Sequence, residues 1–333
     1  MANTTVGNVH VNVPLSNLAI RYMPIQDGFI ADEVAPRIPV ANESNVYYTW
    51  QQDDFFSVDV SDLVPDRGTP REVDFTATTA SYTAARRELG WTISQRERNN
   101  ADSQLVLETA KQQGVLARLA LLREQRVAAL LKAGGTTTIL GEIISGGLNS
   151  SMTAAANPKF DVSTTLYQDF SGQLTVGIRA MRQTIGVRPN TIIIPAYVAE
   201  GMMKSGIFSA AGGPINQYSG TPDNNPYFDQ YPLLPTSIMG MRVLVPGNIK
   251  NTAKEGQTAS YSDIWGKDVT LLYVTPGPSM TIPSVAYTFT AEPLLTRQAR
   301  DDIRRMDEYF VGNTIAEKVV APFAGYTITA AAT

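Results

Sequence analysis

Residues 317–328 of this 333-residue chain read Glu-Lys-Val-Val-Ala-Pro-Phe-Ala-Gly-Tyr-Thr-Ile, and Gly312-Asn313-Thr314 just before them predicts a turn. Pro322 predicts a break at a strand edge, and Gly325 predicts the turn that follows it. The β-branched residues that favour a pleated strand are Val319, Val320, Thr327 and Ile328. The segment therefore predicts a C-terminal strand pair that is tied into a sheet.

The composition excludes several classes of protein. The chain has 333 residues, of which 43% are apolar. This length exceeds what one hydrophobic core usually covers, so we predict two lobes, each with its own core. A net charge of −4 and a pI near 5.2 argue against a uniformly basic surface that binds nucleic acid. No apolar run approaches the roughly 20 residues that span a bilayer, so we expect no membrane association. The segment Met1–Thr5 has no basic region or apolar core, which predicts no signal peptide.

Catalytic signals are missing from the sequence. There is no cysteine and a single histidine, His10, so disulfides, thiolate chemistry and cysteine-ligated or histidine-rich metal sites are excluded. Phosphate-loop, nucleophile-elbow and dinucleotide-binding motifs do not occur. The pairs Asp53-Asp54 and Asp301-Asp302 are adjacent, so a strand would point their carboxylates to opposite faces. We therefore predict no catalytic residue, no cofactor and no metal, and a protein that is not an enzyme.

The first 80 residues divide into two parts. Residues 1–44 contain Pro14, Pro24, Pro36 and Pro39, a density that blocks long helices and predicts an extended arm. Residues 45–80 hold two strand patterns, 46–50 and 73–79, which predict a long hairpin with an acidic tip. Its flanks and tip carry two basic residues, Arg67 and Arg71, against eight acidic residues: Glu43, Asp53, Asp54, Asp59, Asp62, Asp66, Glu72 and Asp74.

This hairpin has two interpretations. It can be a solvated surface ribbon, or it can project and dock on an arginine-rich patch of another subunit. Phe55 and Phe56 favour docking, because two phenylalanines at an isolated tip would expose apolar surface to water.

The central part of the chain predicts helices around a sheet. Residues 101–133 lack proline and contain one glycine, Gly114, which predicts a helix of roughly 45 Å that ends at Gly134-Gly135. Residues 136–160 are small and polar and predict a loop between two lobes. A second helix is predicted by the helical spacing of Leu166, Phe170, Leu174, Ile178, Met181 and Ile185.

A buried strand at 191–194 follows the second helix, and Pro195 then opens a short helix that runs to Met203. Strands are also predicted at 241–245, 268–274 and 285–290. Long polar loops are predicted at 205–237 and 247–262. Helices and strands in this order indicate an α+β protein with sheets covered by helices.

This order of elements, together with three strings, resembles the major capsid proteins of tailed bacteriophages with the Hong Kong 97-type fold. The strings are Arg300-Asp301-Asp302-Ile303-Arg304-Arg305, Ile264-Trp265-Gly266-Lys267-Asp268-Val269-Thr270-Leu271-Leu272-Tyr273-Val274-Thr275-Pro276 and Gly325-Tyr326-Thr327-Ile328. The resemblance implies an N-terminal arm (1–44), an extended loop (45–80), a peripheral domain (81–159 and 285–333) with its spine helix (101–133), and an axial domain (160–284).

The resemblance implies self-assembly of pentamers and hexamers into an icosahedral shell around double-stranded DNA, formed in the host cytoplasm as part of the virion. Implied partners are other copies of the chain, a portal protein, separate scaffold and decoration proteins, and DNA held by weak contact. Candidate intersubunit contacts are Phe55, Phe56, Asp53, Asp54, Asp59, Asp62, Arg67, Arg86, Arg87, Arg297, Arg300, Arg304 and Arg305. Candidate residues of the loop at the capsomer axis are Asp223, Asn224, Asn225 and Tyr227.

Two departures from the family narrow this expectation. Some members form an isopeptide bond from a lysine of the extended loop, but the first lysine here is Lys111, so we expect no such cross-link. Some members begin with charged scaffolding helices, and none precedes the arm in this sequence.

Three other functions stay open. An encapsulin shares the fold and houses a cargo enzyme. A phage tail or lattice protein would form tubes or sheets, and a hydrolase that uses only carboxylates would need a pocket that raises their pKa values. The spine arginines Arg118, Arg123 and Arg126 could contact packaged DNA, although ion pairing between subunits is the preferred interpretation.

Overall fold

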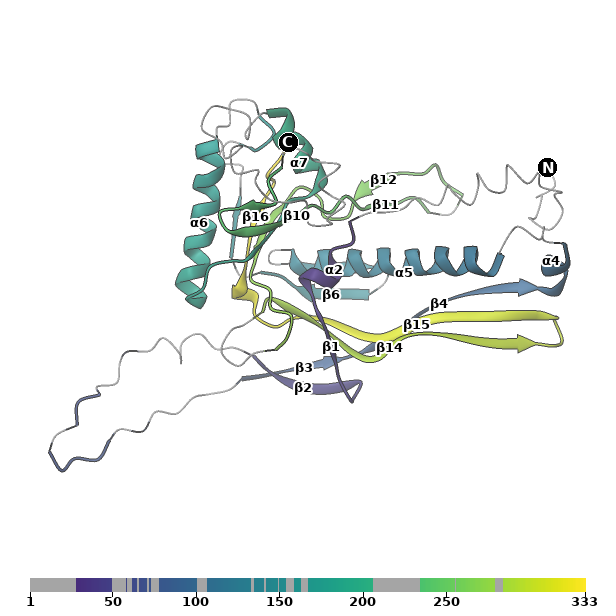
Figure 1. Ribbon diagram of the computed structural model, residues 1–333, viewed down its shortest axis with the longest axis horizontal. Coiled ribbons are helices and arrows are strands. Elements are labelled where there is room, and N and C mark those ends of the chain that lie inside the picture. Colours follow the sequence, from purple (N-terminus) through teal and green to yellow (C-terminus); the bar gives the residue numbers. More distant parts are fainter. Residues whose placement is uncertain are drawn as a thin grey trace.

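Figure 1 presents a computed structural model of the chain, an elongated molecule with a long strand layer beneath one long helix and a second lobe at one end. It describes residues 28–49, 58, 62–64, 66–70, 72, 78–100, 107–132, 135–140, 142–148, 150–153, 159–162, 167–205, 234–254, 256–278 and 284–333.

The long layer is a four-stranded sheet. Its order is β1 (Arg37–Pro39), β14 (Ala286–Asp301), β15 (Met306–Val319) and β4 (Ala85–Ser94). The first pair is parallel and the other two are antiparallel. β14 is buried where it begins and mostly exposed beyond its midpoint. The sheet therefore starts inside the molecule and extends out of it as a ribbon.

The spine helix α5 (Leu107–Leu131) lies along this sheet, as predicted, and ends before Gly134-Gly135. Residues 101–106, where the sequence predicts its first turns, lie outside the described residues. The short helix α4 (Gln95–Asn100) begins where β4 ends. Ser94 accepts a hydrogen bond from the Glu97 backbone N–H, and the Glu97 carboxylate accepts one from the Ser94 N–H. This capping box explains the change from strand to helix at Ser94.

The second lobe contains a six-stranded sheet. In order, its strands are β7 (Ser150–Thr153), β16 (Gly325–Thr329), β13 (Val269–Leu272), β8 (Thr191–Ile193), β10 (Met241–Leu244) and β9 (Ser237–Ile238). Every residue of β8 and β13 is buried, and for β8 the sequence predicts this burial.

The predicted pairing of the two C-terminal strands is wrong. The two turns predicted there are also wrong, because Gly312-Asn313-Thr314 lies within β15 and Gly325 is the extended first residue of β16. β15 belongs to the four-stranded sheet, whereas β16 lies between β7 and β13 in the six-stranded sheet. The cause is the 3-10 helix η4 (Pro322–Ala324), because Pro322 ends the first strand and redirects the chain. The last strand, predicted to belong to the peripheral domain, thus pairs with β13, which lies within the predicted axial domain. The division into domains stays a proposal.

Helices cover this second sheet. α6 (Tyr167–Ile185) buries Phe170, Leu174, Ile178, Met181 and Ile185, the stripe that its helical spacing predicts. It is followed by Gly186, whose φ of +72° favours glycine. α7 (Ala196–Ser205) follows Pro195, also as predicted.

Two segments predicted to be loops contain strands. Residues 136–160 hold the hairpin of β5 (Gly135–Ile139) and β6 (Glu142–Gly146), then β7. The threonines and isoleucines of this segment suit a pleated strand, and Ile139 and Ile144 pack on Leu130 of α5. Residues 247–262 contain β11 (Ile249–Asn251), which pairs with β12 (Tyr261–Asp263). Polar composition concealed both hairpins.

The extended hairpin is confirmed where it is described. β2 (Ser44–Thr49) pairs antiparallel with β3 (Thr78–Thr83), and residues 73–77 of the predicted second strand lie outside the described residues. The described end of the arm is bound to its own chain: Ile30 and Val34, in and beside α2 (Ala31–Val34), are fully buried in the main core.

Candidate assembly surface

The spine helix carries a buried carboxylate that joins three parts of the chain. Glu124 is fully buried and accepts hydrogen bonds from the Ile30 and Ala31 backbone N–H groups at 3.1 and 2.9 Å. It also accepts one from Trp265 Nε1 at 2.8 Å. Burial raises the pKa of Glu124, against the effect of these three donors. The end of the arm, the spine helix and the second lobe are therefore held together at one side chain.

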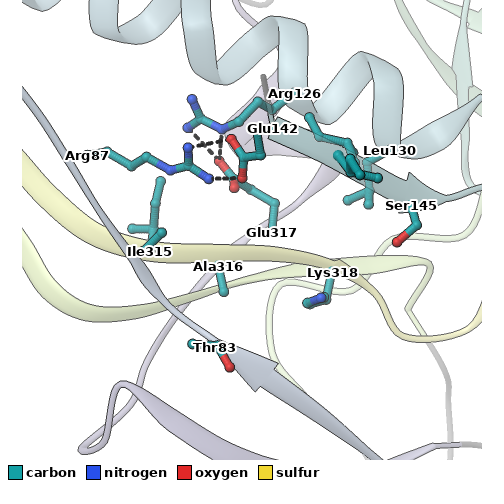
Figure 2. A pocket seen from close by; sticks show the side chains of 13 residues that line it. Thr83, Arg87, Arg126, Leu130, Glu142, Ser145, Ile315, Ala316, Glu317 and Lys318 are labelled. Carbon is teal, nitrogen blue, oxygen red and sulfur yellow. Dashed lines mark hydrogen bonds and ion pairs between the residues drawn. The ribbon is translucent and has the colours of Figure 1, made fainter. Parts of the chain in front are cut away.

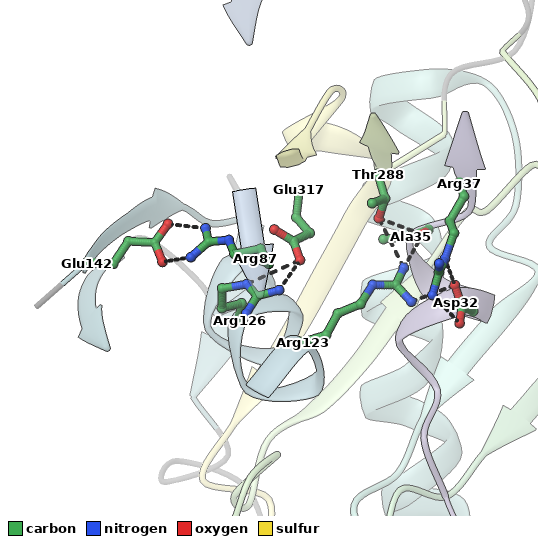
Figure 3. A network of polar contacts seen from close by, with 9 residues as sticks. All are labelled: Asp32, Ala35, Arg37, Arg87, Arg123, Arg126, Glu142, Thr288 and Glu317. Atoms are coloured by element: carbon green, nitrogen blue, oxygen red, sulfur yellow. Dashed lines mark hydrogen bonds and ion pairs between the residues drawn. The ribbon is translucent and has the colours of Figure 1, made fainter. Parts of the chain in front are cut away.

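The neighbouring arginine on α5 makes a second connection to the arm (Figure 3). Arg123 is 6% exposed and pairs with Asp32 at 2.5 Å, and Arg37 pairs with the same carboxylate at 2.7 Å. Arg123 also donates to Thr288 Oγ1 at 3.2 Å. This network holds α2 and β1 against the spine helix and β14.

A third set of charges lies between the spine helix, the four-stranded sheet and the β5–β6 hairpin (Figure 2). Arg126 pairs with Glu317 of β15 at 2.8 Å, and both side chains are buried. Beside them Arg87 of β4 pairs with Glu142 of β6, and a cavity of about 110 Å³ lies between these elements. A charged side chain that is shielded from water depends on its partner, because loss of one partner leaves the other charge uncompensated. Each pair therefore holds together the two elements that carry its residues.

These contacts correct the prediction for the spine arginines. Arg123 and Arg126 are buried and pair with carboxylates of their own chain. Only Arg118 of the three is exposed. The partners, Asp32 and Glu317, are 91 and 191 residues away in sequence, so helix spacing alone does not reveal them.

Most of the arginines proposed to receive the acidic loop also have partners in their own chain. Arg86 pairs with Glu88 at 2.8 Å, and Arg297 lies within 3.6 Å of the same carboxylate. Further pairs are Arg297 with Glu292, Arg300 with Asp302 and Asp307, and Arg304 with Asp301. Strand register brings these charges together, and most of these pairs are exposed and contribute little stability each.

The tip of the β14–β15 hairpin has a different character. Arg305 and Arg96 have no ion pair with any described residue, and both are exposed. With Arg304 they line a hollow of about 660 Å³, whose other lining residues are Ser94, Gln95, Asn99 and Asn100. Ile303, at the same tip, is 97% exposed. The tip therefore combines unpaired positive charge with an apolar side chain in water.

The extended hairpin also exposes apolar side chains. Val46 and Tyr48, two residues apart on one face of β2, are 58% and 72% exposed, and further along Val58 and Leu63 are 96% and 83% exposed. Asp62 and Arg67 are exposed as well. The predicted contact residues Asp53, Asp54, Phe55, Phe56 and Asp59, and the axis-loop residues Asp223, Asn224, Asn225 and Tyr227, lie outside the described residues.

Sequence reasoning missed several exposed apolar residues. Val46 and Tyr48 could have been found from their alternation along a strand, and Ile303 from its place among five charged residues. Leu140 and Ile143, 86% and 69% exposed on the β5–β6 hairpin, were hidden because that segment was assigned to a loop.

No group of three or more metal-ligating side chains gathers anywhere in the described part of the chain. None of its helices is long and apolar enough to cross a membrane.

Solved structures with a similar fold span almost the whole chain. A phage-related protein from Bordetella bronchiseptica is 18% identical with a TM-score of 0.59, over 97% of this chain and 98% of that one. The structure described as Microbacterium phage Oxtober96 is 12% identical with a TM-score of 0.59, over 92% of this chain and 92% of that one. The SrpI encapsulin complex of Synechococcus elongatus is 12% identical with a TM-score of 0.54, over 96% of this chain and 95% of that one. No curated protein matches the sequence.

A family model described as phage capsid protein matches residues 77–328. That range runs from the second strand of the extended hairpin, through the spine helix and both sheets, to the strand that carries Tyr326-Thr327-Ile328. It covers about three quarters of the sequence and includes the strings on which the resemblance rests. The chain therefore belongs to the phage capsid protein family, and its α+β structure is the Hong Kong 97-type capsid fold.

Proposed function

We propose that this chain is the major capsid protein of a tailed phage, and that it assembles as pentamers and hexamers into an icosahedral shell around double-stranded DNA. Membership of the capsid family supports a structural shell protein. The pentamers and hexamers, the packaged DNA and assembly in the host cytoplasm belong to the proposal, as do a portal protein and separate scaffold and decoration proteins.

One observation carries the self-assembly. Three projections of the molecule each expose large apolar side chains: Tyr48 and Leu63 on the extended hairpin, Leu140 on the β5–β6 hairpin and Ile303 at the β14–β15 tip. Exposed apolar groups on several projections favour contact with more than one neighbour. A repeated contact of this kind is what a closed shell built from one chain requires.

We place the acidic loop of one subunit on the tip of its neighbour's β14–β15 hairpin. Arg96 and Arg305 are the cations there without a carboxylate among the described residues, and the hollow beside them has room for acidic side chains. Complementary charge would set the register of the contact. Buried area from Phe55 and Phe56 would supply most of the binding free energy.

Electron microscopy of the purified protein tests the shell. We expect closed particles of uniform size, from the protein expressed alone or from its native source, and an absorbance ratio that indicates nucleic acid in the native particles. Tubes or sheets would indicate a tail or lattice protein. Monomers in both preparations would overturn the proposal.

Two variants test the docking of the loop. Phe55→Ser combined with Phe56→Ser should give folded subunits that assemble poorly, whereas Val176→Ser, at a half-exposed position of α6, should assemble normally. Arg305→Glu should also reduce assembly, and Arg179→Glu, an exposed arginine on α6, should not. Normal shells from both loop and tip variants would reject this contact.

An encapsulin is the second candidate, and the likeness to SrpI over 96% of this chain favours it specifically. It predicts shells that copurify with a protein cargo and contain no genome. Mass spectrometry of the native particles distinguishes the two, because a stoichiometric second protein without nucleic acid would replace the viral proposal.

A further inference from the structure

The strand β4 leaves one edge of the four-stranded sheet open. β4 pairs with β15 on one side and with no described strand on the other. The Gln95 N–H donates to the Arg305 carbonyl, so the backbone groups of odd-numbered residues point toward β15. By alternation, those of Arg86, Glu88 and Gly90 point outward, and the Thr92 carbonyl on that edge accepts a hydrogen bond from Lys111 Nζ. An unpaired edge of this length can accept another strand.

A groove with apolar and charged lining residues lies directly beside this edge. Its volume is about 520 Å³, and it runs between β4, the spine helix and the β5–β6 hairpin. The charged lining residues are Arg86, Arg87, Glu88, Arg126 and Glu142. The apolar lining residues are Ala85 and Leu89 of β4, Leu119 and Leu122 of α5, and Ile139 and Leu140 of the hairpin. Leu140 is 86% exposed, and the two α5 leucines are only half-buried. The groove therefore lacks an apolar cover among the described residues.

The sequence contains one segment that fits both features. Residues 8–13 read Asn-Val-His-Val-Asn-Val, so every second side chain is valine, and Pro14 follows. Strict alternation predicts a strand with one apolar face, and proline is tolerated where such a strand ends. Six residues extend about 20 Å, which is the length of Ala85–Gly90 along β4. The polar face consists of Asn8, His10 and Asn12, without a carboxylate or an arginine that would compete for the Arg86–Glu88 and Arg87–Glu142 pairs.

The geometry favours a segment from another copy. Leu122 and Arg126 line the groove, one helical turn apart on one face of α5. Glu124 lies midway between them in sequence and hence on the opposite face, where it binds the Ile30 and Ala31 N–H groups. Ile30 and Ala31 of the chain's own arm thus contact α5 on the side away from the groove.

We propose that residues 8–13 of a neighbouring copy add as a fifth strand to the open edge of β4 and place Val9, Val11 and Val13 in the groove. Backbone hydrogen bonds to the outward groups of β4 and burial of the valines would bind the strand. The inference rests on the proposed shell function, because a second copy of the chain must lie close enough to supply residues 8–13.

Disulfide mapping tests the contact, because the chain has no cysteine of its own. One variant carries Val9→Cys, Val11→Cys or Val13→Cys. A second carries Leu119→Cys or, in case that half-buried site disturbs folding, Leu140→Cys at the exposed rim. The two are assembled together, oxidised and run on a non-reducing gel. Asn8→Cys, His10→Cys and Asn12→Cys serve as matched controls on the polar face.

We expect a covalent dimer of the two variants from at least one valine position and at most one-tenth of that yield from the polar positions. A link that forms only when both cysteines are in one chain would overturn binding between copies. Intact shells without any link would overturn the strand addition and leave the shell function standing. A wild-type protein that never assembles would overturn both.

Discussion

The two sheets of this molecule are stabilised in different ways. The central strands of the six-stranded sheet, β8 and β13, are buried along their whole length and packed against α6. The four-stranded sheet is buried in part: β14 is buried where it begins, and β15 buries residues such as Val311 and Ile315. Ion pairs such as Arg126–Glu317 and Arg87–Glu142 fasten it to the spine helix and the β5–β6 hairpin. The centre of the six-stranded sheet is thus held by buried apolar side chains, whereas the four-stranded sheet presents an open edge at β4, exposed apolar side chains and cations without a described carboxylate.

This difference separates folding from assembly. Burying apolar area supplies most of the free energy of folding, so the six-stranded sheet should set the stability of the isolated subunit. The exposed ribbon contributes little to that stability and offers surfaces to neighbours. Substitutions in the two sheets should therefore change different observables.

The largest difference in stability is expected when the same substitution, leucine to alanine, is made separately in each sheet. Leu271→Ala in β13 empties space at a fully buried site and should lower the free energy of unfolding by about 3 kcal/mol or more. Leu295→Ala in β14, where the leucine is 49% exposed, should cost less than about 1 kcal/mol. Urea unfolding of the unassembled subunit measures both, and equal losses would contradict the comparison.

The buried pair under the spine helix should come next. Glu317→Gln leaves the Arg126 guanidinium buried without its counterion and should cost about 3 kcal/mol. Adding Arg126→Met removes the stranded charge, so the double variant should recover part of this loss. A double variant that is less stable than the sum of the two single variants would show that the pair does not act as a unit.

The pH dependence of stability distinguishes two carboxylates of this region. Hydrogen bonding to Arg87 holds the pKa of Glu142 below its ordinary value of 4.5, against the effect of burial. A depressed pKa gives stability that is present above pH 4.5 and is lost as pH falls through the folded-state value. Glu124 has the opposite sign, because its raised pKa makes its contribution fall as pH rises above 4.5.

Glu142→Gln isolates the first of these contributions. Between about pH 7 and about pH 3, the wild type should lose more unfolding free energy than the variant, by less than about 1 kcal/mol because the carboxylate is 40% exposed. Urea unfolding at several pH values measures the difference. A variant that loses more stability in acid than the wild type would contradict the role of the Arg87–Glu142 pair.

Local patterns predicted much of the fold. The stripe from Phe170 to Ile185 and the run Thr191–Ile194 identified α6 and β8, because their spacing depends on one element alone. The start of the helix after Ser94 was predictable for the same reason. The strand pair at the C-terminus was not, because the partner of β16 is β13, more than fifty residues earlier. Local sequence does not determine which distant strand a segment will join.

The candidate surface was less predictable for a related reason. Counting charges indicated that Arg86, Arg297 and Arg300 were available to a partner, but strand register places Glu88, Glu292 and Asp307 beside them. The same register leaves Arg305 without a described carboxylate. The Hong Kong 97-type resemblance supplied the order of elements and no information on individual ion pairs. Whether a charged side chain is available to a partner depends on the residues that surround it in space. Sequence spacing does not identify those residues outside a helix or a hairpin.

The smallest effect on the subunit is expected at the hairpin tip. Ile303→Ser changes a side chain that is 97% exposed and packs on almost nothing, so the free energy of unfolding should stay within about 0.5 kcal/mol of the wild type. The yield of shells should nevertheless fall, since the apolar group that a neighbour would cover is gone. Sedimentation of assembly reactions measures that yield, with Val176→Ser on α6 as the matched exposed control. A loss of subunit stability would place Ile303 in a fold-stabilising contact, whereas unchanged stability with full assembly would remove the tip from the set of surfaces that the four-stranded sheet offers to its neighbours.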